Sequence, residues 1–234
     1  MLRALELDPE LSSQLVTAQR LEERRGQRGS GLPALDALLG GGWPRGALSE
    51  LSGRRSSGRT SVLLAALARA GRAGEATALV DTGGALDPRA AAACGVPLPR
   101  LLWIRCAPAQ ALKAADLVVS AGGFDVLALD LGDARPRPSV PTAAWVRLKH
   151  GAERQGTSVL VLTPARAVGA FAVAAVELSA TSPRFFPDPG PGGPPLLDGA
   201  RVKIECVRRA GRSATDNHEE HHAPCAWLAF TCRS

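Results

Sequence analysis

The sequence predicts an α/β domain with a mainly parallel central sheet, flanking helices and antiparallel strands at its C-terminal end. From Ala47 to residue 163, short apolar runs alternate with helical stretches of about 10–15 residues, an order typical of parallel β-α-β units with right-handed crossovers. Beyond Ala170 the helical periodicity ends, and further strand-like runs follow. With 234 residues, the chain is long enough for one domain with a complete apolar core.

Residues 1–25 have the periodicity of an amphipathic helix, with an apolar stripe made of Leu2, Leu5, Leu11, Leu15 and Val16. The polar, glycine-containing residues 27–31 follow it. We therefore divide the chain into residues 1–28, an N-terminal helix that is a candidate arm for docking on a partner, and residues 29–234, the core domain. The alternative is that this helix packs on its own domain.

The expected elements of the core follow in order along the chain. Strands are predicted at 47–52, 76–81, 101–105, 124–130 and 158–162, and helices at 60–71, 108–121 and 142–155. Three C-terminal strands cover 171–180, 201–208 and 226–232, and the Pro/Gly run at 187–199 predicts a loop or wide turn between the first two. We expect these three strands to be antiparallel additions at one edge of the sheet.

Composition excludes a membrane protein and permits a polyanionic partner. No run of about 18 apolar residues is present, and the N-terminus lacks the basic and apolar regions of a signal peptide, so we expect a cytoplasmic protein. The net charge of +6 is compatible with binding a polyanion. It is weak evidence, because arginine far outnumbers lysine and the whole composition is biased.

The cysteines predict neither disulfides nor a metal centre. The chain has five cysteines, which are widely spaced and form no C-x-x-C motif, so reduced thiols are expected. They are Cys94, Cys106, Cys206, Cys225 and Cys232. A polar stretch brings together the zinc-ligand types His218, His221, His222 and Cys225, but their spacing matches no zinc finger, and we expect no metal site.

The main chemical motif is a phosphate-binding loop from Gly53 to Thr60. In the pattern G-x-x-x-x-G-K-[ST], backbone N–H groups wrap an anion, a lysine reaches the outer phosphates and the hydroxyl serves Mg²⁺. The loop lies between a predicted strand and a predicted helix, whose N-terminus adds its positive dipole end; the alternative is a glycine-serine turn with this spacing by chance. The candidate anion or nucleotide site consists of Gly53, Ser56, Ser57, Gly58, Arg59, Thr60, Ser61 and Asp130.

Arg59 stands where this motif has lysine. A guanidinium is larger, planar and forked, so productive geometry at a γ-phosphate is not expected, although an anion can still bind the backbone N–H groups. Asp130 ends a predicted strand at the carboxyl edge of the sheet, where we expect it to face the loop. Asp81 is a second strand-end carboxylate, and either residue is alternatively an ordinary solvated one.

Residues 29–61 resemble the segment of bacterial RecA that carries its phosphate loop, including the short Leu-x-x-Leu-Asp helix and the glycine turn before it. The similarity continues in the same order through 79–102, which contains Ala85-Leu86-Asp87-Pro88, and through 124–130 and 201–209. It covers roughly residues 29–232 and implies a RecA-like P-loop NTPase core.

Departures from RecA imply a degenerate ATPase site. Where RecA carries its catalytic glutamate this chain has Gly83, so the carboxylate that orients or deprotonates the attacking water is missing. Pro164 stands in place of the glutamine that senses the γ-phosphate in RecA. Together with Arg59, these positions imply that the protein is not an enzyme, and that it has no cofactor beyond residual ATP binding.

The two long DNA-binding loops of RecA have shorter counterparts here. Residues 133–141, which contain several prolines, replace the first loop, and residues 164–169 lead directly into the next predicted strand in place of the second. Direct DNA binding is therefore expected to be weak or absent, with Arg135 and Arg137 as the remaining candidates for a phosphate contact.

A reduced RecA-like domain of this kind resembles the ImuA family, accessory proteins of bacterial mutagenic repair. The resemblance implies a non-catalytic adaptor in the SOS response to DNA damage and in error-prone translesion synthesis. The implied partners are an ImuB-like Y-family polymerase homologue, an error-prone DnaE-type polymerase and RecA. The alternatives are a RecA-family DNA-dependent ATPase or recombinase with weak ATP binding, and a modulator of RecA filaments.

Overall fold

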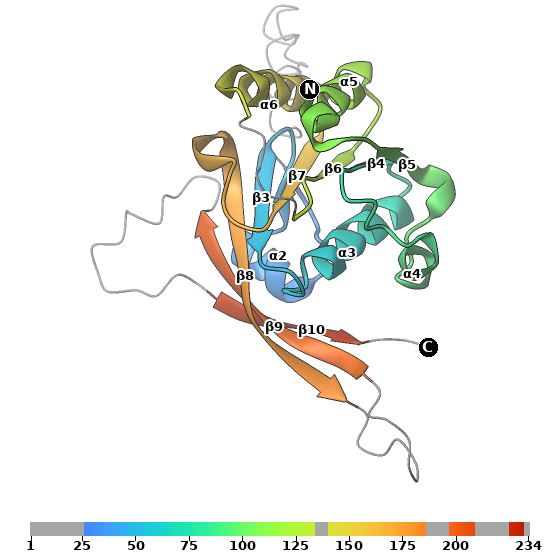
Figure 1. Cartoon of the computed structure of the whole chain (residues 1–234), viewed down its shortest axis with the longest axis vertical. Coiled ribbons are helices and arrows are strands. Elements are labelled where there is room, and N and C mark those ends of the chain that lie inside the picture. The colour runs from blue at the N-terminus through green and yellow to red at the C-terminus, as the bar shows by residue number, and fades with distance from the viewer. Residues whose placement is uncertain (1–25, 134–139, 186–196, 209–224, 232–234) are drawn as a thin grey trace, which may run out of the picture.

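The computed structural model describes residues 26–133, 140–185, 197–208 and 225–231, which form the expected α/β arrangement (Figure 1). The main sheet has the strand order β10-β9-β8-β3-β7-β6-β4-β5. Neighbouring strands from β8 to β5 are parallel, whereas β9 and β10 run antiparallel to their neighbours. A mainly parallel sheet with antiparallel strands at one edge is therefore confirmed.

The parallel part of the sheet contains the strands and long helices predicted from periodicity. Its strands are β3 (Leu48–Gly53), β4 (Thr77–Asp81), β5 (Leu101–Arg105), β6 (Val126–Asp130) and β7 (Ser158–Thr163). The helices are α2 (Pro33–Leu39), α3 (Arg59–Arg72), α4 (Pro88–Ala93), α5 (Ala111–Ala121) and α6 (Thr142–Gln155), with short 3-10 turns η1 (Leu98–Arg100), η2 (Pro108–Gln110) and η3 (Gly169–Phe171).

The helices cover both faces of this sheet. Helices α5 and α6 lie on one face, and α2, α3 and α4 lie on the other (Figure 1). Successive side chains of a strand point to opposite faces. In β4, Ala78 and Val80 pack towards α5 and α6, whereas Leu79 packs towards α3. By the same alternation, the strand-end residues Asp81 and Asp130, which are register partners, lie on the α3 face.

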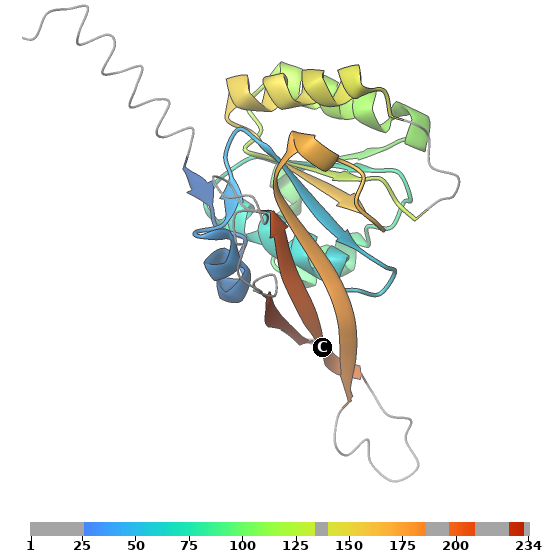
Figure 2. The same cartoon turned by 90° about the vertical axis from the view of Figure 1, so that its left-hand side faces the viewer.

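The C-terminal strands correct one prediction. Strand β8 (Ala172–Phe185) pairs in parallel with β3, so only β9 (Leu197–Arg208) and β10 (Cys225–Thr231) are antiparallel additions. The reason is the connection from β7: the chain crosses over β3 through η3 and returns in the same direction on its other side. Strands β8 and β9 are also longer than predicted and extend beyond the helices (Figure 2).

The start of the core lies earlier than the sequence-based division placed it. Gln27 and Arg28 form strand β1, which pairs with β2 (Trp43–Pro44) in a separate two-stranded sheet. Arg28 is 5% exposed and forms ion pairs with Glu75 and with Asp125, the latter at 3.3 Å. Arg28, assigned to the arm, therefore packs into the core, whereas Gln27 is exposed and joins the core domain only through the pairing of β1 with β2. The helix predicted for residues 1–25 lies outside the described residues.

None of the described helices has the length and apolar character needed to cross a membrane. Within the described ranges, no three His, Cys, Asp or Glu side chains are gathered as a metal site would need. His218, His221 and His222 lie outside those ranges, as do Arg135 and Arg137, so the hypotheses about zinc and about a phosphate contact remain predictions.

Candidate functional site

A cavity of about 1020 Å³ lies at the carboxyl ends of β3, β4 and β6. The phosphate loop and the first turn of α3 form one wall, and the segments after β4 and β6 form another. Of the predicted site residues, Ser56, Ser57, Gly58, Arg59, Thr60, Ser61 and Asp130 line it. Gly53 does not line the cavity; it ends β3 where the loop begins.

The loop has the backbone geometry that its glycines predict. Gly58 adopts φ 90° and caps α3, which begins at Arg59, with no side-chain hydrogen bond to the cap. A Cβ on Gly53 would lie 2.5 Å from Ser57 Oγ and 2.8 Å from the Leu178 carbonyl oxygen, so no other residue fits there. Ser56 has φ 60° and is the one described non-glycine residue in the left-handed region.

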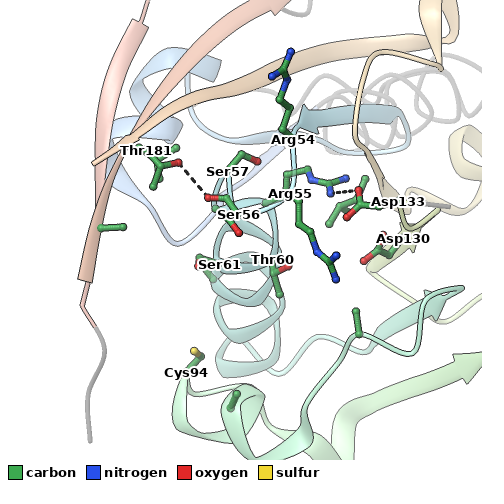
Figure 3. A pocket seen from close by; sticks show the side chains of 18 of the residues that line it. Arg54, Arg55, Ser56, Ser57, Thr60, Ser61, Cys94, Asp130, Asp133 and Thr181 are labelled. Atoms are coloured by element: carbon green, nitrogen blue, oxygen red, sulfur yellow. Dashed lines mark hydrogen bonds and ion pairs between the residues drawn. The ribbon is translucent and has the colours of Figure 1, made fainter. Parts of the chain in front are cut away.

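The C-terminal strands contribute a wall that the sequence did not predict. Thr181 of β8 donates a hydrogen bond from Oγ1 to the Ser56 carbonyl oxygen at 3.1 Å, which braces the loop (Figure 3). Gly199, Ala200 and Val202 of β9 line the same side. No motif marks these residues, because their position depends on the long-range pairing of β8 with β3.

Other lining residues were not predicted either, among them Arg54, Arg55 and Cys94. Arg54 and Arg55 occupy variable positions of the motif. The sequence therefore places them in the loop but does not predict a role for them. In Figure 3 their side chains leave the loop in opposite directions. Cys94, an exposed free cysteine at the end of α4, lies on the far side of the cavity from the loop.

Arg59 is held by an acidic side chain inside the cavity. Its Nη2 donates to Asp133 Oδ1 at 2.6 Å, shown in Figure 3 as the dashed line that ends at Asp133. The Arg59 side chain is 11% exposed, and the Asp133 side chain is 39% exposed. Asp133 lies in the segment after β6, next to the turn at Gly132. The guanidinium that replaces the motif's lysine is thus paired within the chain.

Asp130 faces the loop, as predicted. It lines the cavity and accepts a hydrogen bond from the Gly132 N–H at 2.9 Å. Burial raises the pKa of this carboxyl above its ordinary value, and the carboxylates of Asp81 and Asp133 raise it further. The Gly132 hydrogen bond and the Arg59 guanidinium act in the opposite direction without cancelling the rise.

Asp81 has a structural role. It is 2% exposed and accepts hydrogen bonds from the backbone N–H groups of Gly83, Ala85 and Leu86. It also accepts one from the indole Nε1 of Trp103 at 3.2 Å. Asp81 therefore shapes the segment after β4 instead of facing a ligand, and the ordinary solvated alternative is wrong for it.

Gly83 lines the cavity at a place with free space. A Cβ built on it would have only the Ala85 Cβ nearby, at 4.0 Å, so a side chain would fit. Pro164 directly follows β7 and is not among the lining residues. The carboxylates in the described lining are Asp130 and Asp133, both accounted for above.

Glu50 is a buried charged residue that sequence reasoning missed. Its side chain is fully buried on β3, and its Oε1 accepts hydrogen bonds from Thr163 Oγ1 and from the backbone N–H groups of Ala167 and Val168. Thr163 is the last residue of β7, and Ala167 and Val168 belong to the short connection from β7 to η3. Glu50 thus anchors the segment that we compared with the second RecA loop on sequence grounds. A glutamate within a strand gives no signal of such a contact.

The family follows from comparison with known proteins. A model of the RecA N-terminal domain matches residues 15–140, more than half of the chain. The chain belongs to the RecA family. The RecA proteins of Francisella tularensis subsp. novicida (strain U112) and subsp. holarctica (strain LVS) are each 41% identical to it over 103 residues. This match covers 43% of the chain and 29% of each RecA, so the chain matches under a third of their length.

A solved structure supports the same assignment at the level of the fold. The crystal structure of the RadB recombinase superimposes with a TM-score of 0.62 at 18% sequence identity. The superposition covers 86% of this chain and 94% of RadB. The RecA-like fold expected from the phosphate loop and its surroundings is therefore confirmed.

Proposed function

We propose that this RecA-family chain is a non-catalytic adaptor in error-prone translesion DNA synthesis after DNA damage, of the type seen in the ImuA family. Its partners would be an ImuB-like Y-family polymerase homologue, a DnaE-type polymerase and RecA. The proposal has two parts, the loss of ATP hydrolysis and the binding of these partners. The first part is supported by site geometry, and the second by the sequence resemblance.

The observation that carries the loss of hydrolysis is the ion pair between Arg59 and Asp133 at 2.6 Å. Phosphoryl transfer depends on a cation positioned at the outer phosphates, because the transferred group carries spread negative charge. Here that cation is a forked guanidinium directed at a carboxylate of its own chain. Gly83 adds to this, since it leaves the water-activating position without a carboxylate.

The anchored β7–η3 connection supports weak or absent DNA binding. A mobile loop that wraps DNA needs length and freedom, whereas residues 163–168 are short and tied to Glu50 by three hydrogen bonds. This agrees with an adaptor whose contacts are with proteins.

Hydrolysis is tested with the purified full chain, Mg²⁺ and ATP, with and without single-stranded DNA. We expect phosphate release no faster than that of the Arg59→Ala and Asp130→Ala variants. Turnover by the unaltered chain that either substitution removes would overturn the proposal.

Partner binding is tested by deleting residues 1–25 and retaining Arg28, because Arg28 belongs to the core. We expect the deletion to abolish pull-down of the ImuB homologue or RecA and to leave the thermal unfolding temperature unchanged. Undiminished pull-down would show that the arm is not the docking element.

A slow RecA-family ATPase is the second candidate, favoured by one observation. The loop keeps its backbone geometry around Gly58, and Thr60 and Asp130 still line the cavity. The same hydrolysis assay decides between the two. Addition of the chain to a RecA strand-exchange reaction tests the remaining alternative, a modulator of RecA filaments.

A further inference from the structure

The Arg59–Asp133 pair places a negative charge of the chain itself beside an anion-binding loop. Arg59 Nη2 bonds Asp133, while its Nη1 is buried and has no hydrogen-bond partner among the described residues. A buried guanidinium N–H without an acceptor is unfavourable, because the group has lost its hydrogen bonds to water and forms none with the protein. The loop therefore retains an unmet capacity to donate to an oxyanion.

A second observation at the same place points to the same class of ligand. Ser57 is 6% exposed and lines the cavity, and no described group bonds its buried Oγ. Helix α3, 14 residues long, begins at Arg59 after the cap residue Gly58 and lacks a side-chain cap. A free hydroxyl, a free guanidinium N–H and uncapped helix N–H groups are all donors, so an oxygen-rich anion satisfies them together.

We propose that the loop is still an oxyanion site and that Asp133 is its competitor: a phosphate group that binds there competes with the Asp133 carboxylate for Arg59. Two anions beside one guanidinium repel each other, so the Asp133 carboxylate lowers the affinity of the loop for a phosphate. This inference rests on the proposed function in one respect, that the bound phosphate is not hydrolysed. The ligand class is a phosphate chain, either free or carried by a nucleoside.

The competition makes a specific prediction for Asp133→Asn. Removing the competing charge frees Arg59, so affinity for a phosphate chain should rise at least tenfold over the unaltered chain. The double variant with Arg59→Ala should lose this gain, and Ser57→Ala in the Asp133→Asn background should weaken binding severalfold. Asp116→Asn is the matched control: it makes the same charge change on α5, where Asp116 pairs with Arg147 outside the cavity.

The measurement is isothermal titration calorimetry on the full chain at low salt without magnesium. Inorganic pyrophosphate tests the phosphate chain alone, and ATP tests the same chemistry carried by a nucleoside. We expect Asp133→Asn to bind both with comparable affinity, and Asp116→Asn to remain within twofold of the unaltered chain. Thermal unfolding of each variant without ligand checks that the fold is intact.

Several results would overturn the competitor role or the site. Equal affinities of Asp133→Asn and the unaltered chain for the phosphate probes would show that Asp133 does not compete with the ligand. Binding that survives Arg59→Ala would show that Arg59 does not hold the phosphate. Binding of ATP but not pyrophosphate would exclude recognition through the phosphates. Failure of the proposed function is a separate outcome. It would be seen as hydrolysis of ATP by the unaltered chain, whatever its affinity for pyrophosphate.

Discussion

At the scale of single residues, burial and pairing decide what each charged group does. Asp81 and Asp130 end neighbouring strands in register, yet their environments differ. Asp81 accepts four hydrogen bonds and shapes a turn, whereas Asp130 accepts one and faces the cavity. Two carboxylates at equivalent strand ends thus have different roles because of what surrounds them.

The pKa of Asp130 predicts a pH-dependent effect of Asp130→Asn. Burial raises the pKa of this carboxyl in the folded chain, so folding favours its protonated form. The stability that this preference contributes is fully present below the ordinary pKa of 3.8 and is lost as the pH rises through the pKa of the folded chain. The amide does not titrate and can still accept the Gly132 hydrogen bond. We therefore expect the variant to be more stable than the unaltered chain at pH 7, with the advantage shrinking as the pH falls towards 4.

Urea unfolding at both pH values measures this difference. A variant that is less stable at neutral pH, or whose advantage is the same at both values, would contradict the assigned effect of burial.

At the scale of elements, buried charges connect segments that the sheet alone would not hold. Arg28 ties β1 to Glu75 and Asp125 at the amino-terminal side of the strands. Glu50 ties β3 to the connection after β7. Both contacts lie away from the cavity, so they stabilise the frame on which the phosphate loop is held.

Truncating Glu50 should be costly. Glu50→Ala leaves the Thr163 hydroxyl and the Ala167 and Val168 N–H groups without their acceptor, which we expect to cost about 3 kcal/mol of unfolding free energy. Glu50→Gln retains one carbonyl oxygen and should cost less than half as much. Chemical denaturation of the two variants provides the comparison, and an equal loss for both would show that packing rather than hydrogen bonding fixes this connection.

At the scale of the whole molecule, one apolar cluster unites the antiparallel edge with the parallel part. Val202, Ile204 and Leu228 of β9 and β10 belong to the same buried cluster as Leu35 of α2 and Val62 of α3. A long β-ribbon at a sheet edge would otherwise be a separate, marginal unit. We infer that the C-terminal strands are part of the cooperative core.

Ile204→Ala tests this cooperativity. Ile204 is fully buried, so its truncation should lower the unfolding free energy by about 2–5 kcal/mol while a single transition is kept. Leu102→Ala, at a position 42% exposed on the edge strand β5, should cost below about 1 kcal/mol. Two separate transitions in calorimetry for the Ile204 variant would show that the edge strands unfold on their own.

From the sequence alone we could predict the order of the main strands and helices, the phosphate loop, and the loop residues and Asp130 that line the cavity. These features are local: periodicity over about ten residues separates helix from strand, and the glycine spacing specifies the turn. The sequence also identified Arg59 and Gly83 as departures from RecA.

The folded structure was needed to find the partner of Arg59, the anchoring role of Asp81 and Glu50, the hydrogen bond from Thr181 to the loop and the place of Arg28 in the core. Asp133 lies 74 residues from Arg59, and Thr181 lies 125 residues from Ser56. Contacts over such separations depend on strand order and register, which no local pattern encodes. For the same reason β8 was predicted as a strand, while its parallel pairing with β3 was not.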